Sequence, residues 1–143
     1  MPTTRTLALA VALLGLAAPA PATTVHVPAD QPLISRAFNY ADPGDTVLVA
    51  PGVYHELSLS PPEGVLLRGA GVSPEDVVID GQGVHRVMIL GGVGEDTVVE
   101  NLTIRGGEVS DVGGNLYVLS SRAVFRDCVI ENGRAPRGGG AYI

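Results

Sequence analysis

The sequence predicts an all-β protein built as a parallel β-helix, a solenoid in which each coil stacks on the one before it. One phrase recurs as PEDVVIDG, VVENLTIRGG and VFRDCVIENG, and it places Asp76, Asn101 and Asp127 in register. A repeat of about 20 to 50 residues is typical of solenoids. Nineteen glycines and eleven prolines suit many short elements joined by turns. An antiparallel β-sandwich is the competing architecture, but it does not require this residue-by-residue recurrence.

The composition limits both the core and the partners. Hydrophobic residues make up 45% of the 143-residue chain and aromatic residues only 4%, so a core has to consist of Val, Leu, Ile and Ala. The length suits one domain. The formal net charge is −6. This acidic balance argues against a nucleic acid partner, because surfaces that bind phosphate backbones are basic.

Residues 1–22 are typical of a secretory signal peptide. Arg5 supplies the positive charge, residues 7–17 form an apolar run too short to span a bilayer, and Ala20-Pro21-Ala22 is an A-x-A cleavage site. A buried N-terminal helix is the alternative, but the segment is not amphipathic. We expect cleavage before Thr23. We therefore expect a secreted, periplasmic or cell-surface protein with no membrane span once the signal is removed.

Residues 23–45 are predicted to form an N-terminal strand and a capping helix. Thr24 to Val27 is a short extended piece. Apolar residues recur at helical spacing over Gln31 to Ala41, and Asp30 precedes them as the expected N-cap. Solenoids need caps because a terminal coil exposes an apolar ring and unpaired strand edges. The residues expected against the first coil are Leu33, Ala37, Phe38 and Ala41.

Residues 46–143 are predicted to form the coils of the β-helix. After Thr46 no segment has the length or the period of a helix, and the apolar runs are short and bounded mostly by Gly, Pro, Asn or Asp. Taken in threes, these runs form about three coils and the start of a fourth. They are Leu57–Leu59, Val65–Leu67 and Val77–Ile79; Val87–Leu90, Thr97–Val99 and Leu102–Ile104; Leu116–Leu119, Ala123–Phe125 and Cys128–Ile130; and Ala141–Ile143, with Thr46–Val49 before them.

The alternation of side chains in a strand predicts which residues face the core. In the second coil we expect Thr97, Val99, Leu102 and Ile104 to point inward. We expect Glu100, Thr103 and Arg105 to point outward. In the third coil the corresponding inward residues are Ala123, Phe125, Cys128 and Ile130, and the outward ones are Arg126, Val129 and Glu131.

Asn101 and Asp127 fall where the strand has to bend. The side chains of Asn and Asp can bond their own backbone at such a position. The recurring phrase is therefore interpreted as one corner of each coil.

The N-terminal segment resembles a known superfamily. Residues 25–59 are similar to the start of many secreted right-handed parallel β-helix proteins of the pectin lyase-like superfamily. Their sequence is VHVPADQPLISRAFNYADPGDTVLVAPGVYHELSL. There a capping helix precedes a Gly-Asp-Thr-Val turn, here residues 44–47, and a Pro-Gly-x-Tyr-x-Glu segment, here residues 51–56. The resemblance covers nearly all of the chain after the signal and implies a right-handed β-helix.

The resemblance says less about activity. This opening is shared by pectin methylesterase-like, lyase-like and non-catalytic members. In the enzymes the catalytic residues lie on central coils beyond the end of this chain, so no catalytic residue is carried over.

One segment suggests a metal. GGVGEDTVV, residues 91–99, matches a nonapeptide that binds calcium in tandem repeats, and it makes Asp96 a candidate ligand. The segments on either side do not continue the pattern, so a glycine-rich loop is the competing interpretation. Calcium is the only candidate cofactor.

Charged residues are expected in two outward columns. Glu100 should meet Arg126 of the next coil in a surface ion pair, and Asp80, Arg105 and Glu131 should form a second column. Neither column places two carboxylates side by side, as glycoside cleavage requires.

The remaining reactive residue types form no recognisable site. His26, His55 and His85 share no metal-ligand spacing, and no Ser-His-Asp arrangement is present. The single cysteine, Cys128, replaces Leu102 in the repeat and is expected to be a small core residue. We predict no catalytic residue within these 143 residues.

The leading functional hypothesis is a secreted β-helix whose flat solvent-facing surfaces bind extracellular polysaccharide or are displayed toward it. The first alternative is an N-terminal portion of a polysaccharide lyase, glycoside hydrolase or pectin methylesterase-like enzyme. The second is a structural surface passenger or adhesin. Because no polar cap follows Ile143, we expect the chain to continue in a longer β-helix. We also expect the chain to self-associate through its open C-terminal coil.

Overall fold

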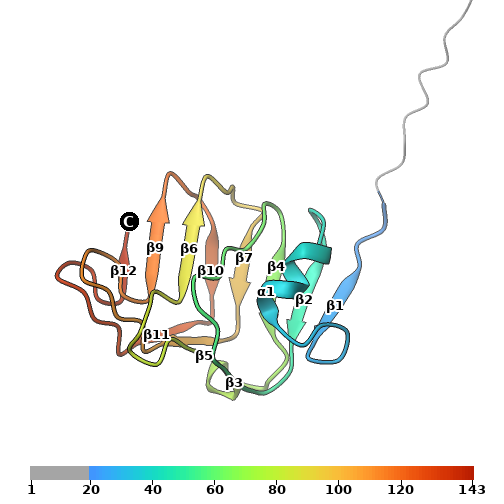
Figure 1. Ribbon diagram of the computed structural model, residues 1–143. Helices are drawn as coiled ribbons and strands as arrows, with labels where there is room; N and C mark the ends of the chain where they lie inside the picture. The colour runs from blue at the N-terminus through green and yellow to red at the C-terminus, as the bar shows by residue number, and fades with distance from the viewer. Residues whose placement is uncertain (1–19) are drawn as a thin grey trace, which may run out of the picture.

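The protein is a right-handed parallel β-solenoid, as the sequence predicts. The structure, a computed structural model, describes residues 20–143, and the rest of the expected signal segment lies outside the described residues. Three parallel sheets run along the solenoid, and α1 lies near one end while the C-terminus lies near the other (Figure 1). Within residues 20–143 no helix is both long and apolar enough to cross a membrane.

Each sheet collects one strand from each of several coils, and all pairings are parallel. Sheet A stacks β1 (Thr24–Val27), β2 (Thr46–Val49), β4 (Leu66–Gly69), β7 (Val98–Glu100) and β10 (Val124–Arg126). Sheet B stacks β3 (Gly52–Tyr54), β5 (Val77–Asp80), β8 (Thr103–Arg105) and β11 (Val129–Glu131). Sheet C stacks β6 (Met88–Gly91), β9 (Leu116–Leu119) and β12 (Ala141–Tyr142).

The solenoid has more turns than the sequence predicts. The strand expected before the coils, β1, pairs in parallel with β2 as the first strand of sheet A. The strand β3, which the sequence did not predict, pairs with β5 in sheet B. The strands β2 and β3 therefore form an additional coil before the predicted ones. The five strands of sheet A therefore correspond to about five turns rather than three and a fraction. Gly52 and Val53 in β3 are exposed, so no apolar run marks this strand.

The predicted register of the coils is confirmed. Leu67, Val99 and Phe125 stack in sheet A, and Ile104 stacks between Ile79 and Ile130 in sheet B. The four residues expected to point inward in the second coil are fully buried: Thr97, Val99, Leu102 and Ile104. This interior is built almost entirely of aliphatic side chains and runs through all the coils.

The prediction that Thr103 is exposed is wrong. Its side chain points outward from β8, yet only 3% of the residue is exposed. The 3₁₀ turn Pro74–Asp76, which precedes β5, folds over this part of sheet B. The Thr103 hydroxyl donates a hydrogen bond to the Pro74 carbonyl oxygen at 3.0 Å. A loop from the neighbouring coil therefore covers a face that alternation alone assigns to solvent.

The corner positions behave as predicted, although their bonds differ. Asn101 and Asp127 adopt left-handed backbone angles, with φ of 53° and 48°. The Asn101 amide donates to the carbonyl oxygens of Gly69 and Gly71, at 3.1 and 2.8 Å. It thus ties its corner to the preceding coil instead of bonding its own backbone. Asp76, in the same register, bonds the backbone N–H groups at the start of its own 3₁₀ turn.

The N-terminal helix is shorter than predicted and has a different cap. The helix α1 spans Ile34–Ala37 and continues as a 3₁₀ turn, Phe38–Tyr40. Asp30 does not cap it, because the Asp30 carboxylate accepts the N–H of His26. Instead, the buried carboxylate of Glu56 accepts the N–H groups of Ile34 and Ser35, at 2.6 and 2.9 Å. A residue that follows β3 therefore holds the start of the helix.

The helix covers the first coils as a cap, with one change in the contact residues. Ala37, Phe38 and Ala41 are buried in the core, as predicted. Leu33 was expected there as well but is 44% exposed. Ile34 takes its place and is completely buried. Since α1 begins at Ile34, later than predicted, only the first of the four expected contact residues changes.

Candidate functional site

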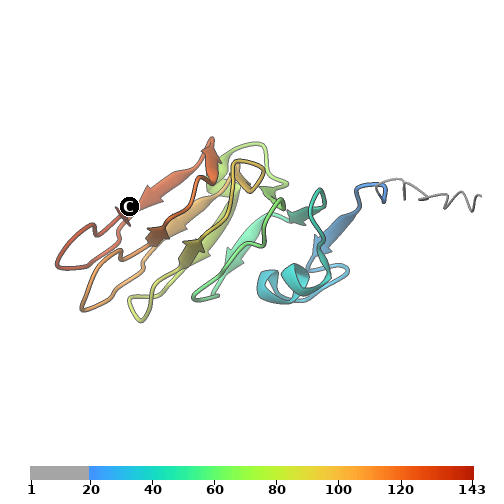
Figure 2. The ribbon, with the colours of Figure 1, turned by 90° about the horizontal axis from the view of Figure 1, so that it is seen from above.

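Long loops join the strands of sheet B to those of sheet C and project side by side from one edge of the solenoid (Figure 2). They comprise residues 81–87, 106–115 and 132–140, and we call them the loop ladder. Isolated parallel bridges join Glu108 to Arg134 and Val112 to Arg137. The loops of successive coils are therefore stacked in register, like the strands.

An open groove runs between the loops of the loop ladder. Its larger part, of about 560 Å³, is lined by Gly83, Val84, His85, Glu108, Val109, Ser110 and Asp111. A second part, of about 300 Å³, is lined by Gly83, Gly106, Gly107, Glu108, Asn132, Gly133 and Arg134. Because the two parts share Gly83 and Glu108, they form one continuous surface across three coils, which we call the loop groove.

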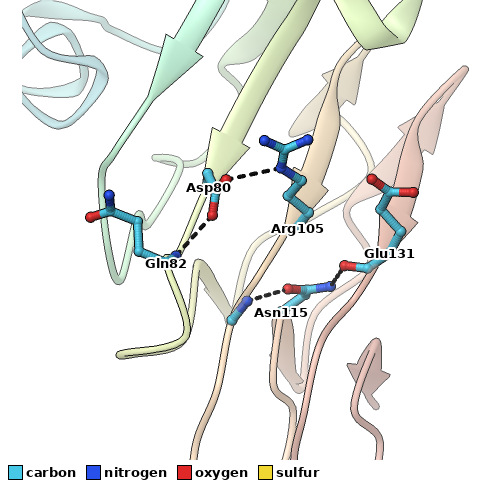
Figure 3. A network of polar contacts seen from close by, with 6 residues as sticks. Asp80, Gln82, Arg105, Asn115 and Glu131 are labelled. Atoms are coloured by element: carbon cyan, nitrogen blue, oxygen red, sulfur yellow. Dashed lines mark hydrogen bonds and ion pairs between the residues drawn. The ribbon is translucent and has the colours of Figure 1, made fainter.

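A polar network lies where sheet B passes into the loop ladder (Figure 3). Arg105 Nε lies 2.9 Å from Asp80 Oδ2, and Asp80 Oδ1 accepts the N–H of Gln82 at 2.8 Å. The hydrogen bond from Gln82, assisted by the Arg105 guanidinium, holds the pKa of Asp80 below its usual range. The predicted column of Asp80, Arg105 and Glu131 is confirmed in its register.

Asn115 joins two coils inside this network. It is fully buried, its Oδ1 accepts the N–H of Gly107 and its Nδ2 donates to the carbonyl oxygen of Glu131, both at 2.7 Å. A buried amide with both ends bonded makes the surrounding backbone rigid. The base of the loop groove is therefore fixed by paired polar groups.

Arg86 anchors the loop 106–115. Its guanidinium Nη2 lies 3.0 Å from Asp111 Oδ1, and its Nε donates to the Gly113 carbonyl oxygen at 2.9 Å. The N–H of Val112 and the Arg86 guanidinium keep the pKa of Asp111 below its usual range. Thus Asp111 is a bonded carboxylate and not a free one.

The same arginine links the groove to an aromatic column on sheet C. The Arg86 guanidinium lies 4.9 Å from the centre of the Tyr117 ring, a cation–π arrangement. Tyr117 stacks on Tyr142 of the next coil, with ring centres 6.0 Å apart. Both tyrosines are half-buried on the outer face. Sheet C thus presents two flat aromatic rings beside the loop ladder.

The residues singled out in the sequence are not brought together. Asp96 lies in an exposed turn before β7. In the part of the chain that the structure describes, no cluster of three or more His, Cys, Asp or Glu side chains is arranged to hold a metal ion. Of the three histidines, His85 alone lines the loop groove.

The expected ion pair between Glu100 and Arg126 is not formed. The two residues are register partners on β7 and β10, as predicted. Across residues 20–143, however, the ion pairs are Arg86–Asp111, Arg105–Asp80 and Arg122–Glu95. A pair at the solvent-facing surface stabilises little, so hydration competes well with it.

Cys128 is a half-buried residue that packs against the core, close to the predicted role. Burial raises the pKa of its thiol. The thiol donates to the carbonyl oxygens of Val99 and Arg126, at 3.4 and 3.2 Å. It therefore has the environment of an unreactive cysteine.

The sequence analysis missed the loop groove. Glu108, Ser110 and Asp111 lie between the pairs Gly106-Gly107 and Gly113-Gly114. The sequence feature that could have indicated the groove is this interval, a polar stretch between two glycine pairs that belongs to no predicted strand.

The fold and the loop groove together define a class of protein: a right-handed parallel β-solenoid with a polar groove along the loops of successive coils. Comparison with models of known families, with curated protein sequences and with solved structures found no match.

Proposed function

We propose that this chain is a secreted β-solenoid that binds an extracellular polysaccharide along the loop groove. The observation that carries the proposal is the continuity of the groove across three coils. A linear polymer presents the same groups at regular intervals, and a solenoid repeats its surface at the spacing of its coils. An extended ligand can therefore meet equivalent positions on successive loops.

The chemistry of the groove suits a sugar chain. Glu108, Ser110 and Asn132 line it with hydrogen-bonding groups, and Val84 and Val109 add apolar surface. Ligand sites usually combine apolar walls with a few polar groups that fix orientation. The C–H faces of sugar rings can also pack on the nearby rings of Tyr117 and Tyr142. The resemblance of residues 25–59 to the pectin lyase-like superfamily supports the same class of ligand.

We propose binding without catalysis at this groove. Glycoside hydrolysis usually needs two carboxylates, one of them able to carry a proton. Asp111 bonds Arg86 and its pKa is lowered, so it is unsuited to act as an acid. The second carboxylate on the groove wall, beside Glu108, is therefore one that is already paired with an arginine.

Blocking the groove tests this proposal. Ser110→Trp places a bulky ring in the larger part of the groove and should weaken polysaccharide binding at least about tenfold. Ser35→Trp, on the exposed face of α1, is the matched control and should leave binding unchanged. Affinity electrophoresis against a panel of acidic, neutral and amino-containing polysaccharides, followed by calorimetry, measures the effect. Equal binding by both variants, or no binding to any polymer, would contradict the proposal.

Secretion has a separate test. The A-x-A site at residues 20–22 predicts that exported protein begins at Thr23. N-terminal sequencing of protein recovered outside the cytoplasm should find this residue first. Exported protein that retains residues 7–17 would rule out cleavage at this site.

A further inference from the structure

The loop groove has one carboxylate that lacks a cationic partner. Glu108 is exposed, lines both parts of the groove and takes part in none of the ion pairs found within residues 20–143. The other two carboxylates of this region differ, since Asp80 is paired with Arg105 and Asp111 with Arg86. The centre of the groove therefore carries a negative charge that is free to bind a ligand.

Two of the three nearby arginines, Arg86 and Arg105, are occupied. Arg86 uses its Nε on Gly113 and its Nη2 on Asp111 and Val112, while Arg105 is held by Asp80. No arginine lines the larger part of the groove; the third, Arg134, is the register neighbour of Glu108, lines only the smaller part and forms none of the ion pairs found within residues 20–143. The whole chain is acidic as well, with a net charge of −6. Its long-range field thus attracts cationic groups and repels anionic ones.

We propose, resting on the polysaccharide function above, that the ligand is a glycan that carries amino groups and not carboxylates. An ammonium group donates hydrogen bonds to a carboxylate, and such charge-assisted bonds are stronger than neutral ones. A polyuronate would instead place its carboxylates beside Glu108, and like charges in contact are unfavourable. Glu108 is the residue that determines this specificity.

The experiment compares three oligosaccharides of equal length by calorimetry: oligoglucosamine, its fully N-acetylated form and oligogalacturonate. The amino form should bind most tightly and the galacturonate most weakly. Glu108→Gln should lower the ratio of amino to acetylated affinity about twofold to fivefold. Glu75→Gln changes the net charge equally, at an exposed position outside the groove, and should leave the ratio unchanged.

The outcomes separate the two proposals. If none of the oligosaccharides and none of the wider panel binds, the proposed function itself fails. If neutral glycans bind but oligogalacturonate binds as well as the amino form, the function stands and the specificity is overturned. Binding of the amino form that survives Ser110→Trp, or that Glu75→Gln weakens as much as Glu108→Gln, would also overturn it, because attraction to the whole surface would then explain it.

Discussion

Replacing Ile104 with Ala should lower the free energy of unfolding by about 2 to 5 kcal/mol. Ile104 is completely buried in β8 and stacks between Ile79 and Ile130 of the neighbouring coils. Removing its side chain opens a cavity between coils that cannot close, because the strands above and below hold the backbone in place. Equilibrium denaturation of the isolated chain by urea, followed by circular dichroism, measures the loss.

Ile89→Ala is the matched control. Ile89 lies in β6 of the same coil but points outward, next to Tyr117 in sheet C, and is only half-buried. Its loss should cost about 1 kcal/mol or less. Thr103→Ala should fall between the two, at about 1 to 2 kcal/mol, because it leaves the Pro74 carbonyl without its bond. Equal costs for Ile104 and Ile89 would contradict the register.

A polypeptide of residues 23–143 should form dimers through its last coil, and we propose that two copies meet with these coils face to face. In the described structure β10, β11 and β12 each pair on one side only. The apolar side chains of this coil are incompletely covered: Phe125 and Cys128 are half-buried and Ile130 is 38% exposed. Open strand edges beside apolar surface are templates for pairing with another chain.

The opposite end explains why the assembly should be a dimer and not a filament. There a turn bonds both backbone groups of His26 on the outer edge of β1: the His26 N–H donates to the Asp30 carboxylate, and the Asp30 N–H donates to the His26 carbonyl oxygen, both at 2.8 Å. The helix α1 covers the apolar interior next to it. Head-to-tail stacking is thereby disfavoured, and a two-fold contact between equivalent ends remains.

Light scattering and sedimentation test this expectation. Ile130→Lys introduces a charge into the uncovered ring and should yield a monomer. Val72→Lys, at a fully exposed loop position, adds the same charge and should leave the dimer intact. A cooperative monomer of the unmodified polypeptide would contradict the proposal, and so would a filament.

Recurrence in the sequence was sufficient for the fold class and for the register of the central coils. From β5 to β8 and from β7 and β8 to β10 and β11, the stacked inward residues recur after 25 or 26 positions, because each of these strands pairs with its copy one coil away. The corners at Asn101 and Asp127 could be predicted because these residue types tolerate the left-handed backbone. The first turns were undercounted because β3 is not marked by an apolar run.

Local sequence was not sufficient for features in which one coil acts on another. Thr103 is buried because the turn Pro74–Asp76 of the preceding coil lies over it. The cap of α1 comes from Glu56, more than twenty positions further along the chain. Alternation and capping rules describe a strand or helix with its immediate neighbours, and they do not say which distant loop covers it.

The loop groove is also a feature that depends on contacts between coils, and local sequence was not sufficient to predict it. The sequence by itself determined that the chain is a solenoid with an aliphatic interior and which side chains fill that interior. Only the tertiary structure decided that, within residues 20–143, Glu108 lies in a groove without an ion-pair partner while Asp111 is paired with Arg86. The reason is that pairing of charges depends on distances between loops of different coils, and those distances are set when the coils stack.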